Sequence, residues 1–203
     1  MGLTLVIDTA TAACSVALID GDHVIASAHQ IVGRGHAERL VPMIAELPGG
    51  GRAEAILVDC GPGSFTGVRV GLAAAIGLGI GWGVPVSGYS STALIAAAGL
   101  ADNIDWEGLA VVLEGGHGEL FVQPYDRPLA PAGPLASLKP DAALAAIGDR
   151  PAIGTGVRWL GDAGGVEALP DAARAILLPQ ALRTLPPRPI YGRAPDAKPQ
   201  APK

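Results

Sequence analysis

Cysteine and basic residues are both scarce in this sequence of 203 residues, and each shortage argues against a class of protein. Only Cys14 and Cys60 are present, and both lie in apolar segments where a free thiol packs as a small hydrophobic group, so we expect no disulfide. Lys and Arg number 14 against 19 Asp and Glu, which gives a net charge of -5. This balance argues against nucleic acid as a direct partner, because phosphate binding needs clustered basic side chains.

Long apolar runs are missing as well, since no segment reaches the roughly 18 uninterrupted apolar residues of a membrane span. Segment 68–82 comes nearest, but Arg69 and several glycines make it short and weakly apolar, so we interpret it as a buried helix. Met1 leads straight into a predicted strand, without a charged and then apolar leader. We therefore expect a cytoplasmic protein without a membrane partner, and the 49% hydrophobic content favours a folded interior.

The end of the sequence departs from the acidic balance. After Arg183, four basic residues stand against a single acid, Asp196, in a proline-rich stretch; they are Arg188, Arg193, Lys198 and Lys203. A solvated tail and a tail that touches RNA both fit this composition, and we favour the solvated tail.

The first hundred residues predict the order β, β, β, α, β, α, β, α. Asp20-Gly21 is a two-residue hairpin turn, Pro48 begins a run that ends the first helix, and Ser90 or Ser91 can cap the third. The predicted strands are 3–7, 14–19, 23–30, 55–59 and 85–88, and the predicted helices are 36–47, 66–82 and about 91–98.

This order is similar to the ribonuclease-H-like half-domain of the actin, hexokinase and Hsp70 superfamily, whose members pair two such halves. We therefore expect an α/β protein of two ribonuclease-H-like (actin-like ATPase) subdomains, with mixed sheets flanked by helices and an abbreviated second half. The predicted division is 1–100, 101–193 and a tail at 194–203. Strand candidates of the second half are 109–113, 119–124 and 152–154.

Two turns invite a nucleotide-binding interpretation. Asp8, Thr9 and Thr11 follow the first strand, where an actin-like protein would contact phosphate, but Asp and Thr are also common at strand ends for structural reasons. Segment 114–119 is rich in glycine and could face a phosphate, although it lies between two strand candidates. We favour a structural turn for the first and a hairpin for the second.

Evidence for metal or hydrolytic chemistry is weak. His36 has no histidine at the spacing of a helical ligand pair, because the others are His23, His29 and His117, so we expect a helix-end or interface residue and no metal. Ser64 lacks the Gly-x-Ser-x-Gly pattern of a nucleophile elbow.

The helix after Thr66 is the strongest feature. Glycines recur along it, including Gly67 and Gly71, and each interior glycine lowers helix stability by about 1 kcal/mol relative to alanine. Tertiary contacts must offset this loss. The helix can lie close against its own sheet on one face, but glycines on more than one face leave room for a partner, so a bulky residue at Gly71 or Ala75 should abolish partner binding without unfolding the chain.

Several motifs together resemble the TsaB family, the noncatalytic subunit of the bacterial machinery that makes threonylcarbamoyladenosine beside the tRNA anticodon. The matching segments are Ile7-Asp8-Thr9-Ala10-Thr11, Cys14 to Leu18, His36 with Leu40 and Pro42, Gly61-Pro62-Gly63-Ser64-Phe65-Thr66-Gly67, Gly118 to Val122 and Pro189 to Arg193. The glycine-rich run before and after Phe65 is the most diagnostic.

The resemblance implies a scaffold without cofactors. Family members dimerise with the catalytic, actin-like TsaD subunit through a helix bundle, a TsaE ATPase joins them, and tRNA is reached only through the complex. An isolated chain with an unpaired bundle face would favour a homodimer. The implied partner-binding residues are His36, Leu40, Met43, Ile44, Leu47, Gly67, Val70, Gly71, Ala74, Ala75 and Leu78, and Asp8, Thr9 and Thr11 would be a vestigial phosphate loop.

Three departures from the family pattern stand out. The connection 48–54 looks short, segment 114–117 lacks the family's Asp-Ala-Arg, and Pro179 should break the helix before a terminal strand.

Two other functions remain open. One is an actin-fold, ATP-dependent small-molecule kinase that uses Asp8 and segment 114–119, and the other is a metallopeptidase.

Overall fold

The computed structural model describes residues 2–192, so the predicted tail 194–203, with Lys198 and Lys203, lies outside the described residues. The first sheet has the order β3-β2-β1-β4-β5, and β1 pairs antiparallel with β2 and parallel with β4. Its strands are β1 (Leu3–Asp8), β2 (Ala13–Asp20), β3 (His23–Ile31), β4 (Ala55–Asp59) and β5 (Val86–Tyr89). The predicted three-strand meander and the strand order along the chain are confirmed.

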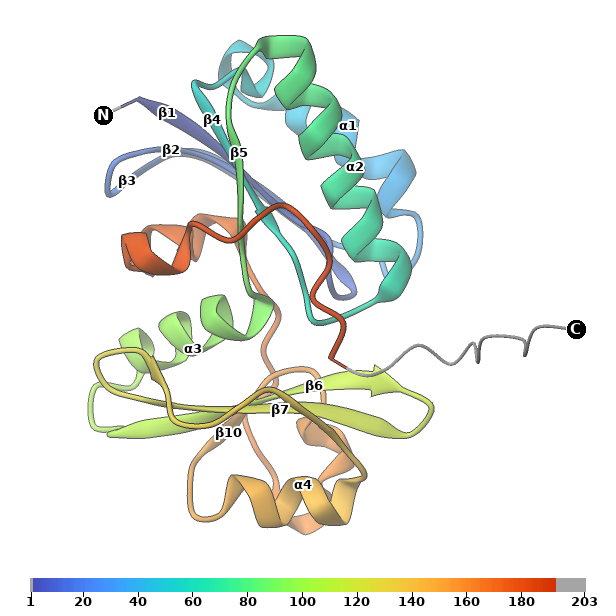
Figure 1. The fold of residues 1–203 in the computed structure, drawn as a ribbon, viewed down its shortest axis with the longest axis vertical. Helices are drawn as coiled ribbons and strands as arrows, with labels where there is room; N and C mark the ends of the chain where they lie inside the picture. The colour runs from blue at the N-terminus through green and yellow to red at the C-terminus, as the bar shows by residue number, and fades with distance from the viewer. Residues whose placement is uncertain (1, 193–203) are drawn as a thin grey trace, which may run out of the picture.

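Alternation along β1 sends its side chains to two different cores, because successive residues of a strand point to opposite faces. Leu5 and Ile7 pack with α1 (His36–Glu46) and α2 (Phe65–Trp82), whereas Val6 packs with α3 (Ser91–Asp102). The first sheet is therefore covered on both faces (Figure 1).

The second sheet has the order β10-β6-β7-β8, with β9 also paired to β7. Its strands are β6 (Gly108–Gly116), β7 (Glu119–Asp126), β8 (Ala130–Pro131), β9 (Ala136–Leu138) and β10 (Ala152–Ile153). One face shares a core with α3, and the other packs against α4 (Pro140–Ile147). Helix α3 consequently lies between the two sheets (Figure 1), and α4 is the one α-helix that follows it within residues 2–192.

The C-terminal segment returns to the first sheet. After short 3-10 helices at Val157–Trp159 and Gly161–Ala163, two more at Ala172–Leu177 and Gln180–Leu182 lie on either side of Pro179, as expected from a proline in that position. Residues 189–192 do not form the expected strand, but the Ile190 N–H donates to the Cys60 carbonyl at 2.7 Å. Segment 172–190 therefore packs with elements of the first half, although the division at residue 100 stays a prediction.

Three local expectations have clear outcomes. Both cysteines are free and buried. Ser90 occupies the N-cap position of α3 but makes no capping hydrogen bond, because its hydroxyl pairs with that of Thr92 and the Ser91 hydroxyl donates to Asp59. By length and composition α2 could span a membrane, contrary to the expectation from segment 68–82, yet a helix of this kind can equally cover the core of a folded protein. Here one face of α2 lies on the first sheet.

Candidate partner-binding surface and the turns beneath it

Helix α2 lies against the first sheet through Val68 and Leu72 and, between them, through residues that have almost no side chain. The Thr9 hydroxyl donates to the Gly67 carbonyl at 2.7 Å. A Cβ on Gly67 would overlap the Thr9 carbonyl oxygen, and a Cβ on Gly71 would lie 2.5 Å from Thr9 Oγ1. These glycines therefore allow the helix to approach the turn after β1. The Ser64 hydroxyl accepts from the Gly67 N–H at 3.2 Å, so this serine is the N-cap of α2.

The opposite side of α2 is apolar and exposed. Ile76 and Ile80 are 40% and 79% exposed, and a Cβ at Gly77 would meet nothing within 4 Å. Arg69 is the one charged residue of the helix, and its guanidinium lies 3.6 Å above the Phe65 ring. From Val70 to Trp82 the helix thus presents no charge to solvent, as is typical of a surface that another protein covers.

Helix α1 extends this surface. The Arg39 side chain donates to Gln30 on β3, which fixes one flank of α1 toward the sheet edge. Val41 is 57% exposed, Ala45 one turn later is exposed as well, and α1 contacts α2. We call the combined face the helix-pair surface; it consists of Val41, Ala45, Val70, Ala73, Ala74, Ile76, Gly77, Leu78 and Ile80.

The predicted partner-binding residues divide into two groups. Three are partly exposed and belong to the helix-pair surface: Val70, Ala74 and Leu78. Eight are buried inside this chain: His36, Leu40, Met43, Ile44, Leu47, Gly67, Gly71 and Ala75. Buried residues position the helices, and a larger side chain at Gly71 or Ala75 would press on the core of this chain. That such a variant loses its partner and stays folded remains a prediction. The prediction does not include Val41, Ile76 and Ile80, which are exposed on the same two helices.

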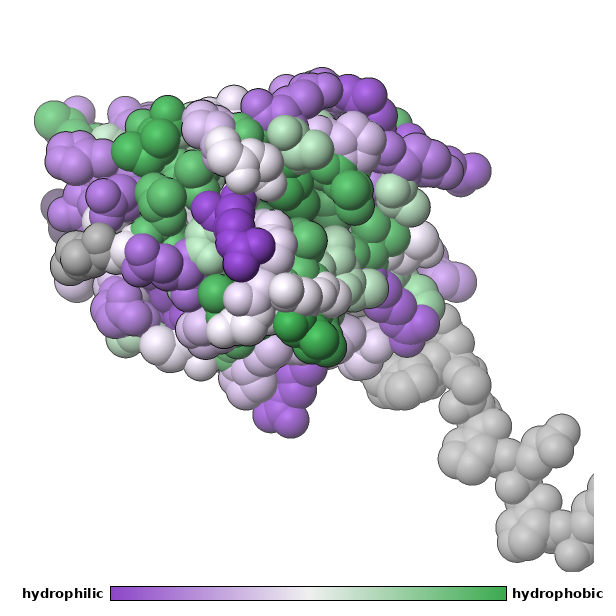
Figure 2. All heavy atoms as spheres, turned by 90° about the horizontal axis from the view of Figure 1, so that it is seen from above, coloured by the Kyte–Doolittle hydropathy of each residue, from purple (hydrophilic) through white to green (hydrophobic). Residues whose placement is uncertain are grey.

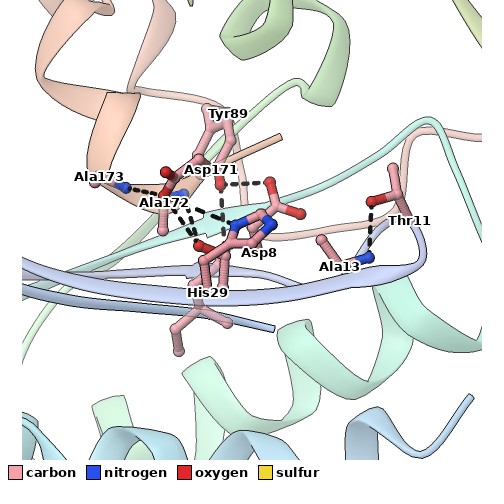
Figure 3. A network of polar contacts seen from close by, with 10 residues as sticks. Asp8, Thr11, Ala13, His29, Tyr89, Asp171, Ala172 and Ala173 are labelled. Carbon is pink, nitrogen blue, oxygen red and sulfur yellow. Dashed lines mark hydrogen bonds and ion pairs between the residues drawn. The ribbon is translucent and has the colours of Figure 1, made fainter. Parts of the chain in front are cut away.

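His36 is the first residue of α1, as expected, and it faces inward. Its Nε2 lies 2.9 Å from the Thr11 carbonyl oxygen and 3.2 Å from that of Ala13, within the turn between β1 and β2. Thr11 Oγ1 in turn accepts from the Ala13 N–H (Figure 3). The histidine therefore anchors α1 to the turn.

The expected phosphate loop is closed. Asp8 is fully buried and accepts a hydrogen bond from the Tyr89 hydroxyl at 2.9 Å (Figure 3). It also accepts from the Ala10 N–H at 3.3 Å. Burial raises the pKa of the Asp8 carboxyl, and these hydrogen bonds only partly oppose the shift. Thr9 is 2% exposed and bonded to α2. This arrangement supports the structural interpretation of the turn.

A cleft of about 1010 Å³ separates this turn from the second sheet. Thr11, Arg34 and Ser64 line one side, and Glu114 with residues of the β6–β7 hairpin line the other. Segment 114–119 forms that hairpin, as expected. Glu114 accepts from Trp159 Nε1 at 2.5 Å and from Arg158 Nε at 3.0 Å, so its carboxylate is already neutralised at the cleft wall.

Metal and hydrolase interpretations gain no support from residues 2–192. No group of three or more His, Cys, Asp or Glu side chains in that range could hold a metal ion. Ser15 is fully buried, donates to Asp171 at 3.2 Å and accepts from the Ala172 N–H, while His29 lies 4.0 Å from Asp171 (Figure 3). The serine bonds to the carboxylate and not to the imidazole, so this trio does not have the order of a catalytic triad.

Comparisons with known proteins agree with the geometry. Residues 23–128 match the family model of TsaD, tRNA N6-adenosine threonylcarbamoyltransferase. The tRNA threonylcarbamoyladenosine biosynthesis protein TsaB of Escherichia coli (strain K12) is 36% identical over 128 residues, covering 61% of this chain and 54% of the relative. The chain thus matches about half the length of that relative.

Two further similarities extend over nearly the whole chain. An uncharacterized protein of Mycobacterium tuberculosis (strain ATCC 25618 / H37Rv) is 30% identical over 216 residues, covering 97% of this chain and 94% of the relative. The crystal structure of an uncharacterized Pseudomonas aeruginosa protein with similarity to peptidase YEAZ has a TM-score of 0.78 and 29% sequence identity, covering 95% of this chain and 100% of that one. The match at this level includes both sheets.

Proposed function

Because this chain belongs to the TsaB/YeaZ family, within the group that the TsaD family model matches, we propose that it is a noncatalytic subunit in threonylcarbamoyladenosine biosynthesis. Its task is to bind and activate a TsaD-like catalytic subunit, which transfers the threonylcarbamoyl group to the adenosine beside the tRNA anticodon. A TsaE-like ATPase joins the pair, and tRNA is reached through the complex in the cytoplasm.

One observation carries the proposal: the residues of the helix-pair surface are exposed or partly exposed, and none of them is charged. Hydrophobic residues gather on the end of the molecule that Figure 2 shows from above. Ile80 is 79% exposed on a helix whose inner face is fully used by the sheet. Small residues beside it, Ala73 and Gly77, let a partner helix approach closely, and the isoleucines supply apolar area to bury. A second copy of this chain could cover the same surface in the absence of the catalytic subunit.

The absence of an assembled catalytic group supports a noncatalytic role. Asp8 accepts a hydrogen bond from Tyr89, and Ser15 donates one to Asp171. Glu114 accepts hydrogen bonds from Arg158 and Trp159. These three polar groups are thus engaged in contacts within the fold.

Reconstitution tests the proposed function directly. Purified chain, a TsaD-like subunit and a TsaE-like ATPase are mixed with tRNA, ATP and threonylcarbamoyl-adenylate, and modified adenosine is measured by mass spectrometry. We expect modification only when this chain and the TsaD-like subunit are both present. Full modification without this chain, or elution of the two proteins as separate species, would contradict the proposal.

An actin-fold kinase is the alternative that the cleft favours, since its volume would accommodate a nucleotide. The buried Asp8 argues against it, because the carboxylate cannot reach a metal or phosphate in the cleft. Calorimetry with magnesium and ATP separates the two functions. We expect no heat of binding for the isolated chain, and micromolar binding would favour the kinase.

A further inference from the structure

Two acidic side chains meet in the interior beneath the partner-binding helices. Strands β1 and β4 run parallel with Ile7 opposite Val58, so the next residues, Asp8 and Asp59, end both strands at the same level. Asp8 is 0% exposed and Asp59 1%. No lysine or arginine within residues 2–192 forms an ion pair with either carboxyl group.

The surrounding groups hold both carboxyls in place. Asp59 accepts from the Gly61 N–H at 2.6 Å and from the Ser91 hydroxyl at 2.8 and 2.7 Å, and Asp8 accepts from Tyr89. Tyr89, which donates to Asp8, is the register partner of Asp59 on β5, so both carboxyl groups lie in the same polar interior. Two neighbouring carboxyl groups can hydrogen-bond to each other only when one of them carries a proton. Two bare negative charges at this depth would repel each other strongly.

We propose that Asp8 and Asp59 hold one proton between them, and that this proton locks together the chain segments that begin α2 and α3. Gly61 opens the loop that leads into α2, Ser91 is the first residue of α3, and Ala10 belongs to the turn on which α2 rests. When the proton leaves, repulsion separates the carboxyls and loosens all three connections. The effect of this shared proton does not depend on which partner covers the helix-pair surface.

The neighbouring thiols and phenol add no further negative charge beside the two carboxyls at neutral pH. Burial raises the pKa of Asp59 well above its usual value, and the negative charge of Asp8 raises it further. The thiols of Cys14 and Cys60, each with a pKa raised by burial to about 11, stay uncharged. On β3, His29 faces Asp8, and its positive charge, when present, lowers the pKa of Asp8.

The raised pKa of Asp59 makes the fold less stable as the pH rises. A carboxyl whose pKa is higher in the folded chain than the 3.8 of an exposed aspartate stabilises the fold fully below that value. The stabilisation is lost as the pH rises through the folded-state pKa. Asp59→Asn reproduces the protonated side chain, because its amide can donate to Asp8 while its oxygen accepts from Gly61 and Ser91.

The test compares wild type, Asp59→Asn and Asp105→Asn by urea unfolding between pH 5 and pH 9. Asp105 is exposed, so its variant controls for the loss of a surface charge. We expect the stability of Asp59→Asn relative to wild type to grow as the pH rises, whereas Asp105→Asn stays parallel to wild type. Parallel profiles for all three proteins would overturn the proposal.

Infrared spectroscopy gives a second readout that needs no stable variant. At pH 7 the wild-type protein should show the carbonyl stretch of one buried, protonated carboxylic acid, and this band should disappear as the pH is raised. Asp59→Asn should lack the band at every pH above the range of exposed carboxyls. A wild-type spectrum without the band at pH 7 would contradict the shared proton even if the variant failed to fold.

Discussion

Gly67→Ala should lower the free energy of unfolding by about 2–4 kcal/mol, a large part of the stability of an ordinary domain. The added Cβ would overlap the carbonyl oxygen of Thr9, which belongs to the backbone and cannot rotate away. Helix α2 would have to lift off the turn after β1 and lose the hydrogen bond from the Thr9 hydroxyl. Urea denaturation followed by circular dichroism measures the change.

Gly77→Ala is the matched control on the same helix. Its Cβ would meet nothing within 4 Å, so only helix propensity acts, and we expect stabilisation by about 0.5–1 kcal/mol. The contrast separates a glycine needed for close approach from one that merely weakens the helix. If both variants changed stability by the same amount, the close packing of α2 on the turn after β1 would be wrong.

The sequence predicts the first sheet well because its signals are local. The Asp20-Gly21 turn joins two strands, Pro48 and the glycines after it end α1, and residues 3–7 form a short apolar run that ends at Asp8. These features depend on neighbours within a few positions of each other. Glycines also lie on two faces of α2, as expected, because Gly67 and Gly71 face the turn after β1 and Gly77 faces open space.

What the sequence could not reveal is which side of α2 faces the sheet. Apolar residues occur all around this helix, so periodicity does not distinguish the buried Ala75 from the exposed Ile80. The prediction chose the small residues that looked unusual, Gly67 and Gly71, and these fill the inner face. The pair Ile76 and Ile80 could have identified the outer face, because these large apolar residues lie one turn apart. The prediction considered only the spacing of the small residues and therefore did not include them.

The sequence did not predict the pair of buried carboxyl groups for a similar reason. Asp8 was recognised as a strand-end aspartate, but its neighbour Asp59 lies 51 positions later, and only the parallel pairing of β1 with β4 brings them together. The return of the C-terminal segment to the first sheet is equally nonlocal, since Leu185 pairs with Gly88. Contacts of this kind depend on the topology and not on local patterns.

Ile80→Lys should weaken binding of the TsaD-like subunit about 100-fold, equivalent to roughly 3 kcal/mol, if the helix-pair surface is the interface. An ammonium group placed there would lose its hydration on binding and find no acidic partner on α2, whose one charged residue is Arg69. Ile80 is 79% exposed in the isolated chain, so the substitution should change the free energy of unfolding by less than about 0.5 kcal/mol. Titration calorimetry measures the affinity, and urea denaturation measures the stability.

Ile104→Lys is the matched control for the loss of an exposed isoleucine. Ile104 is 78% exposed, nearly as much as Ile80, but it lies in the connection between α3 and β6, away from α1 and α2. A nonspecific effect of removing an exposed isoleucine would weaken both variants equally. A specific interface weakens Ile80→Lys alone and leaves Ile104→Lys with wild-type affinity. Unchanged binding of Ile80→Lys would exclude the outer face of α2 as the contact, and the partner would then have to bind elsewhere on the chain.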